Sequence, residues 1–163
     1  MYVQVFMLNQ DDPKKCTAAK LVKFGLARRT RRLSEKTILL DPYSDNFLMP
    51  QDKFKSNSIT AIDCSWNRAE DTFTRKMTGI PRKIPPLFAG NPVNYSKLGK
   101  LTSAEALAGA LCILGNKSMA SEILQKFKWG HTFYELNKNL LEDYSKLTVE
   151  SEIGNLLKEY RIA

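Results

Sequence analysis

Ser58-Ile59-Thr60-Ala61-Ile62-Asp63 is the stretch that decides the fold, because it is an apolar run of strand length that ends on a charged residue. Two similar runs, Tyr2–Leu8 and Thr37–Leu40, precede it. A helical pattern follows the first run over Cys16–Phe24, and another follows the third run over Trp66–Lys76. The order strand, helix, strand, strand, helix predicts an α/β protein built on a largely parallel sheet.

The second half of the chain has a different pattern. Four prolines interrupt residues 80–92, which we expect to form an ordered, irregular connection. The motif Thr102-Ser103-Ala104-Glu105 then matches a capping box, which predicts a helix over Ala104–Leu114. Further helices are predicted over Ser118–Phe127, Gly130–Lys146 and Val149–Tyr160. We therefore divide the chain into an N-terminal α/β part, residues 1–86, and a mostly helical C-terminal part, residues 87–163.

The chain is basic. Its 163 residues include 25 Lys and Arg against 17 Asp and Glu, so that the formal net charge is +8 and the pI is near 9.4, which favours a polyanionic partner. Much of the excess lies in one stretch whose basic residues are Lys14, Lys15, Lys20, Lys23, Arg28, Arg29, Arg31, Arg32 and Lys36. We interpret this stretch as a surface for the phosphates of a nucleic acid, with a lysine-rich surface that serves solubility alone as the alternative.

Composition and motifs argue against several other classes. The chain contains no apolar run of the about 18 residues that are needed to span a bilayer, and its amino terminus alternates like a strand. We therefore expect a cytoplasmic protein. Cys16, Cys64 and Cys112 show no CxxC spacing, which favours buried free thiols over disulfides or zinc ligands. The single histidine, His131, excludes a multi-histidine metal site and is expected at the surface or at a helix cap. Neither a GxxxxGK[ST] loop nor a GxGxxG motif occurs.

Polar residues mark the ends of the three predicted strands. Asp11-Asp12-Pro13 follows the first strand, Asp41-Pro42 follows the second, and Asp63 ends the third. Because ligands of parallel sheets bind outside the carboxyl ends of the strands, we expect a crevice there, with the loop Leu87–Leu101 as a further wall. Asp63 is the candidate for a functional carboxylate, and an aspartate that binds the N–H groups of a helix start is an equal alternative.

Six short strings also occur in a fixed order along the chain. They are Asp12-Pro13-Lys14-Lys15-Cys16-Thr17, Leu40-Asp41-Pro42, Asp63-Cys64-Ser65-Trp66, Arg82-Lys83-Ile84-Pro85-Pro86-Leu87, Asn91-Pro92-Val93-Asn94-Tyr95 and Lys100-Leu101-Thr102-Ser103-Ala104-Glu105-Ala106. As an ordered set, they resemble the small-subunit ribosomal RNA aminocarboxypropyltransferase family, from Met1 through the helix after Glu105.

The resemblance implies a fold and a reaction. The family's fold is similar to that of SPOUT-class RNA methyltransferases, in which the C-terminal part of a parallel-sheet protein threads a deep trefoil knot. The resemblance further implies transfer of the 3-amino-3-carboxypropyl group of S-adenosylmethionine to N3 of a hypermodified pseudouridine, such as N1-methylpseudouridine, in small-subunit rRNA. Methylthioadenosine is the second product, no metal takes part, and a monomer acts on rRNA or a pre-ribosomal particle.

The resemblance also implies which residues bind the cofactor. They are Thr17, Leu40, Pro42, Ile62, Asp63, Trp66, Ala69, Leu87 and Leu101. Leu40 and Pro42 would pack on the adenine, and the backbones of Leu87 and Leu101 would form hydrogen bonds with it.

The remaining positions of this set would hold the ribose and the methionine part. By the same resemblance, Thr17 and Ile62 would bind the ribose, and Trp66 and Ala69 would enclose the S-methyl group. Asp63 would lie beside the aminocarboxypropyl arm, either binding its ammonium group, which we favour, or removing the N3 proton as the catalytic base. Enclosing the methyl group and exposing the arm would direct the reaction to the arm.

The chain departs from the family pattern at three positions of the expected cofactor loop. The family usually has glycine and proline where this chain has Ser96 and Leu98, and alanine where it has Gly90.

We expect Arg75, Lys76 and Arg82 to contact the RNA together with the basic stretch. Two alternatives are an RNA methyltransferase of the same fold and a basic rRNA-binding assembly factor without catalysis.

Overall fold

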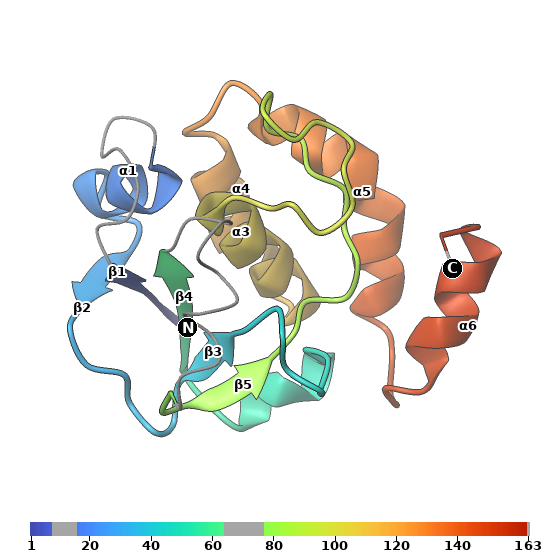
Figure 1. Ribbon diagram of the computed structural model, residues 1–163, viewed down its shortest axis with the longest axis horizontal. Coiled ribbons are helices and arrows are strands. Elements are labelled where there is room, and N and C mark those ends of the chain that lie inside the picture. The colour runs from blue at the N-terminus through green and yellow to red at the C-terminus, as the bar shows by residue number, and fades with distance from the viewer. Residues whose placement is uncertain (8–15, 64–76, 163) are drawn as a thin grey trace.

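A five-stranded parallel sheet forms one half of the molecule. The computed structural model describes residues 1–7, 16–63 and 77–162. The strands are β1 (Tyr2–Met7), β2 (Arg28–Thr30), β3 (Ile38–Leu40), β4 (Ser58–Asp63) and β5 (Ile80–Arg82). They lie in the order β2-β1-β4-β3-β5, and every neighbouring pair is parallel (Figure 1). The α/β class and the parallel sheet predicted from the sequence are therefore confirmed.

Two of the strands were not expected from the sequence. β1, β3 and β4 coincide with the three apolar runs, whereas β2 is a short, basic strand and β5 lies within the stretch expected to be irregular. Both occupy the edges of the sheet. An edge strand accepts charged side chains. It also accepts Pro81, because an edge strand forms hydrogen bonds with only one neighbour and proline, which has no N–H, can stand where no donor is needed.

The helices are α1 (Thr17–Lys23), α3 (Ser103–Ile113), α4 (Lys117–Leu124), α5 (Gly130–Tyr144) and α6 (Glu152–Glu159), with a 3-10 helix at Pro50–Phe54. The mostly helical second half is thus confirmed, although α6 begins three residues later than expected and the 3-10 helix was not expected. The helix predicted over residues 66–76 lies outside the described residues.

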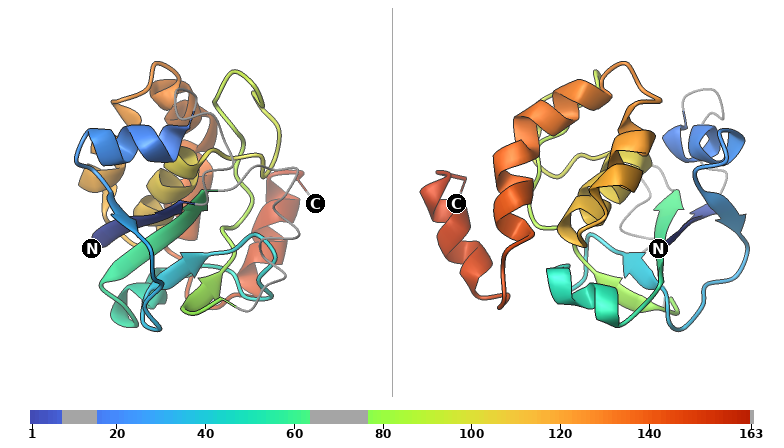
Figure 2. Two further views of the ribbon diagram at one scale, coloured as in Figure 1. Left: turned by 60° about the vertical axis from the view of Figure 1, so that its left-hand side comes forward. Right: turned by 180° about the vertical axis from the view of Figure 1, so that it is seen from behind.

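Helix α3 is the centre of the helical half. Its capping box is confirmed, since the Glu105 N–H donates to Thr102 Oγ1 at 3.2 Å and the Thr102 N–H donates to Glu105 Oε1 at 2.9 Å. α3 packs against β4, α1, α4 and α5, as the views in Figure 2 also show. One cluster of buried side chains accordingly contains residues from both sides of position 86, such as Leu40 and Leu107. α6 lies at the edge of the molecule beyond α5, on the side away from β2 (Figure 1).

Candidate functional site

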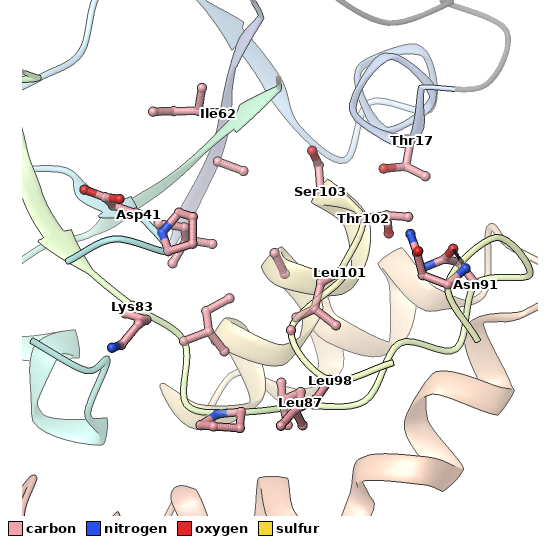
Figure 3. Close-up of a pocket in the computed structure, with 18 of the residues that line it drawn as sticks. Thr17, Asp41, Ile62, Lys83, Leu87, Asn91, Leu98, Leu101, Thr102 and Ser103 are labelled. Atoms are coloured by element: carbon pink, nitrogen blue, oxygen red, sulfur yellow. Dashed lines mark hydrogen bonds between the residues drawn. The ribbon is translucent and has the colours of Figure 1, made fainter. Parts of the chain in front are cut away.

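A cavity of about 690 Å³ opens at the carboxyl ends of β3 and β4. Its walls come from these strand ends, from the chain that follows β5, from the first residues of α1 and α3, and from the loop Leu87–Leu101 (Figure 3). This is the place where parallel α/β sheets bind ligands, and the volume lies within the range of about 300–1,000 Å³ that small-molecule sites have.

The residues expected to bind the cofactor come together at this cavity. Seven of the nine lie in the described part of the chain, and all seven line the cavity: Thr17, Leu40, Pro42, Ile62, Asp63, Leu87 and Leu101. Trp66 and Ala69 lie outside the described residues. In Figure 3, Leu87 and Leu101 approach from the loop, Ile62 from β4 and Thr17 from α1. The lining is mostly apolar with a few polar groups, which suits a ligand that carries a planar base.

Asp63 is a buried carboxylate at the end of β4, with a side chain in contact with the start of α1. The residue is 4% exposed, and the Cys16 thiol donates a hydrogen bond to its Oδ2 at 3.2 Å. Burial, followed by the hydrogen bond to Asp63 and the charge of that carboxylate, raises the pKa of Cys16 to about 11, against the opposing Ala19 N–H bond. The thiol is therefore neutral and acts as a donor to Asp63 at physiological pH.

Cys112 is the second buried free thiol in the described part of the chain. Burial raises its pKa to about 11 as well. The expectation of buried, unpaired cysteines is confirmed for Cys16 and Cys112, whereas Cys64 lies outside the described residues.

Thr17 connects the starts of two helices at the cavity wall. Its Oγ1 accepts a hydrogen bond from the Ala104 N–H, in the first turn of α3, at 3.2 Å. The N-terminal N–H groups of a helix have no partner within the helix, so this bond satisfies one of them and fixes α1 against α3. The Thr17 side chain is thereby held at the cavity by an element 87 residues away in the sequence.

A fully buried carboxylate, Glu105, anchors the cavity loop. Its Oε2 accepts hydrogen bonds from the N–H groups of Gly90 at 2.6 Å and Asn91 at 3.3 Å. Its Oε1 accepts from Asn91 Nδ2 at 2.7 Å and from the Thr102 N–H at 2.9 Å. The capping-box residue of α3 therefore also holds the loop that lines the cavity. Sequence reasoning missed Asn91, although it opens one of the six strings and is a buried polar residue of that loop.

Helix α5 also contacts this loop and the residue just before it. Asn137 Oδ1 accepts a bond from the Phe88 N–H, and its Nδ2 donates to the Phe88 carbonyl, both at 2.8 Å. The Tyr144 hydroxyl donates to the Pro86 carbonyl at 2.8 Å, and burial raises the pKa of this phenol. A Cβ atom on Gly90 would lie 2.5 Å from the Phe133 nitrogen, so the loop backbone touches the helix backbone there.

The three departures from the family pattern have distinct structural settings. Ser96 has a φ of 60°, the left-handed conformation that favours the family's glycine. Gly90 faces α5 at a distance that leaves no room for the methyl group of the family's alanine. Leu98 is exposed and lines the cavity. The loop therefore keeps a backbone suited to glycine at position 96, while α5 approaches position 90 closely.

Of the residues expected to bind RNA, six lie on or next to α1 and β2: Lys20, Lys23, Arg28, Arg29, Arg31 and Arg32. All but the half-buried Lys20 are exposed, and α1 and β2 lie side by side in Figure 1. Arg82 has a different setting, because its Nε pairs with the buried Asp52 carboxylate at 3.1 Å. Lys14, Lys15, Arg75 and Lys76 lie outside the described residues.

Two charged residues that the sequence did not assign to the cofactor also line the cavity. Burial raises the pKa of Asp41, opposed by the N–H bond that its carboxylate accepts from Tyr43. The Lys83 ammonium lies 4.4 Å from the centre of the Phe47 ring. Both side chains lie across the cavity from Thr17 in Figure 3.

His131 lies at the exposed surface of α5, as expected. In the part of the chain that the structure describes, no group of histidine, cysteine and carboxylate side chains could hold a metal ion. Over the same residues, none of the helices combines the length and apolar character needed to cross a membrane.

Comparisons with known proteins identify the family. Residues 38–161 match the family described as "Ribosome biogenesis protein, C-terminal". Residues 4–33 match "Possible Fer4-like domain in RNase L inhibitor, RLI", but they contain one cysteine, whereas an iron–sulfur cluster is held by four ligands.

Curated relatives and a solved structure cover almost the whole chain. The "16S rRNA aminocarboxypropyltransferase" of Methanococcoides burtonii is 46% identical over 98% of this chain and 94% of the relative. The protein of the same name from Thermoplasma acidophilum is 44% identical over 95% of this chain and 98% of the relative. The SAM-dependent rRNA:acp-transferase Tsr3 from Vulcanisaeta distributa superimposes with a TM-score of 0.86 and 39% identity, over 96% of this chain and 89% of that chain. The resemblance inferred from the six strings is thus confirmed, and the chain belongs to the 16S rRNA aminocarboxypropyltransferase family.

Proposed function

We propose that this protein transfers the 3-amino-3-carboxypropyl group of S-adenosylmethionine to 16S rRNA, at N3 of a hypermodified pseudouridine. One observation carries the proposal: the seven described positions at which the family resemblance implies cofactor contacts all line a single cavity. The identity to relatives named as aminocarboxypropyltransferases supports the arm as the transferred group, in preference to the methyl group.

The residues of the cavity suit this cofactor. The apolar walls Leu40 and Leu87 would hold the adenine away from water, and Thr17 would hold the ribose from the α1 side. When bound, S-adenosylmethionine would supply a sulfonium. Its bond to the arm would break as the arm bonds to N3, the N3 proton would pass to water or, if that carboxylate is the base, to Asp63, and the sulfur would leave as a neutral thioether. Asp63 has the burial and charge to hold the ammonium group of the arm.

Several finer features belong to the same proposal. The exposed basic residues of α1 and β2 would hold the phosphates of the rRNA or of a pre-ribosomal particle. The enzyme would act as a monomer in the cytoplasm. The cofactor loop and α3 would belong to a deep trefoil knot, which the trace of an experimental structure of this chain would test.

The two products of the cofactor separate arm transfer from methyl transfer. Purified protein is incubated with cofactor labelled in the arm or in the methyl group and with small subunits from a strain that lacks the gene, whose rRNA keeps the modified pseudouridine. An unmodified 16S rRNA transcript, which has uridine at that position, is the negative control and should stay unlabelled. We expect arm label in the RNA and methylthioadenosine in solution. Methyl label in the RNA with S-adenosylhomocysteine would instead indicate a methyltransferase, and binding without either product would indicate an assembly factor.

Asp63→Asn tests the site itself. Because hydrogen bonds to charged groups contribute about 1.5–3 kcal/mol, we expect S-adenosylmethionine to bind about 10- to 100-fold more weakly in calorimetry. Methylthioadenosine, which lacks the arm, should bind as it does to the wild type. Asp45→Asn changes an exposed aspartate outside the cavity and serves as the control. Unchanged affinity with a reduced kcat would assign Asp63 to proton removal.

A further inference from the structure

The tip of the cavity loop is a rigid turn. The Lys97 N–H donates to the Asn94 carbonyl at 2.9 Å, which closes a β-turn with Tyr95 and Ser96 in its centre. The Asn94 N–H donates to Asn91 Oδ1 at 3.0 Å. Two backbone bonds join the turn to Ala89: the Ser96 N–H donates to the Ala89 carbonyl at 2.7 Å, and the Ala89 N–H donates to the Lys97 carbonyl at 2.9 Å. Since Asn91 is itself bonded to the buried Glu105, the turn is fixed to the core.

This turn presents an apolar and basic surface at the mouth of the cavity. Val93, Tyr95 and Leu98 are 83%, 56% and 41% exposed, and Val93 and Leu98 also line the cavity. Lys97 and Lys100 are exposed beside them. Because hydrogen bonds already hold the backbone that carries these side chains, the loop loses little backbone freedom on binding a partner, which favours a role in recognition.

The occupant follows from the proposed function, on which this inference rests. Transfer to N3 requires a base whose Watson–Crick edge is free, so an unpaired segment of RNA must lie across the cavity mouth. Exposed aromatic side chains stack on the bases of such segments, and lysines beside them neutralise the phosphates. We propose that Tyr95 stacks on a base of the rRNA segment at the cavity mouth and that Lys97 contacts its backbone.

Tyrosine variants test the stacking. Since one base stacked on an aromatic ring is worth about 1–3 kcal/mol, Tyr95→Ala should raise the Kd for 16S rRNA and the KM of arm transfer about 5- to 100-fold. Tyr95→Phe keeps the ring and should restore both values to within about threefold. Tyr2→Ala is the control, because Tyr2 is exposed at the amino end of β1, away from the strand ends that form the cavity. The Kd of S-adenosylmethionine should be the same in all four proteins.

The electrostatic part is tested separately by the salt dependence of RNA binding. Lys97→Ala should reduce the slope of log Kd against log salt by about 0.7–0.9, the value for one phosphate contact. RNA binding by Tyr95→Ala at wild-type strength, an equal loss in Tyr2→Ala, or a parallel loss of cofactor affinity would overturn the inference. Failure of the proposed function shows itself differently, as a wild-type protein that binds RNA but transfers no arm.

Discussion

Glu105→Gln is the substitution that should detach the loop Leu87–Leu101 from the core. The carboxylate is fully buried and accepts four hydrogen bonds, two on each oxygen. A glutamine has almost the same shape but carries an NH₂ group in place of one oxygen. That group would face two donors and could accept neither, whichever way the amide is turned.

The magnitude follows from the bonds that are lost. At least two bonds to a charged acceptor disappear, and each is worth about 1.5–3 kcal/mol, so we expect a loss of about 3–6 kcal/mol in the free energy of unfolding. Rotating the Asn91 amide cannot recover the loss, because its Oδ1 already accepts the Asn94 N–H. At about 2–4 °C per kcal/mol for a chain of this size, Tm should fall by about 6–24 °C.

Urea denaturation and thermal melts of the wild type and of Glu105→Gln measure this difference. Glu142→Gln is the control, since Glu142 is an exposed carboxylate paired with Lys117 and Lys146 and should cost less than about 1 kcal/mol. The affinity for S-adenosylmethionine should fall in Glu105→Gln and stay constant in the control. A Glu105→Gln protein within 1 kcal/mol of wild type would refute the view that this carboxylate anchors the loop.

Three further predictions concern packing, hydrogen bonding and pH. Gly90→Ala should destabilise the fold by about 1–3 kcal/mol in urea denaturation, because the new Cβ meets the α5 backbone, whereas Gly154→Ala, which meets nothing within 4 Å, should be neutral or stabilising; equal effects would contradict the close approach. Asn137→Ala should cost about 2–4 kcal/mol by leaving both backbone groups of Phe88 unbonded, and Asn139→Ala, at an exposed position of the same helix, should cost less than about 1; similar losses would argue against the loop contact. The pKa values of Cys16 and Cys112 are raised from 9.0 to about 11, so the stability that their neutral thiols contribute is complete below pH 9 and should decline as the pH rises toward 11. A variant with serine at both positions should lose less free energy of unfolding over pH 9–10.5 than the wild type, and an equal decline would exclude the thiols as the cause.

The parts of the fold that could be predicted are those that local pattern determines. β3 and β4 are apolar runs that end on polar residues, and the capping box of α3 needs only Thr102 and Glu105. β2 and β5 could not be predicted, because edge strands of three residues acquire their conformation by pairing with β1 and β3 and not from their own composition.

The site shows the same division. Its location followed from the polar ends of the strands, and its cofactor residues followed from the family resemblance. The bonds of Glu105 to Gly90 and Asn91, and those of Asn137 to Phe88, depend on how α3 and α5 approach the loop. No sequence spacing encodes such contacts across 14 to 49 residues, since they arise only when the core assembles.

The contacts between the loop and α5 also constrain the length of that helix. Phe133, Asn137 and Tyr144 along α5 meet Gly90, Phe88 and Pro86 in reverse order, so the two segments run past each other in a fixed register. Each residue of a helix advances the side chains by about 100° and 1.5 Å, so one residue inserted between positions 137 and 144 would turn one contact out of reach of its partner. Lengthening α5 within this span should therefore be far more harmful than lengthening it after Tyr144, and natural variation in helix length should concentrate at that end.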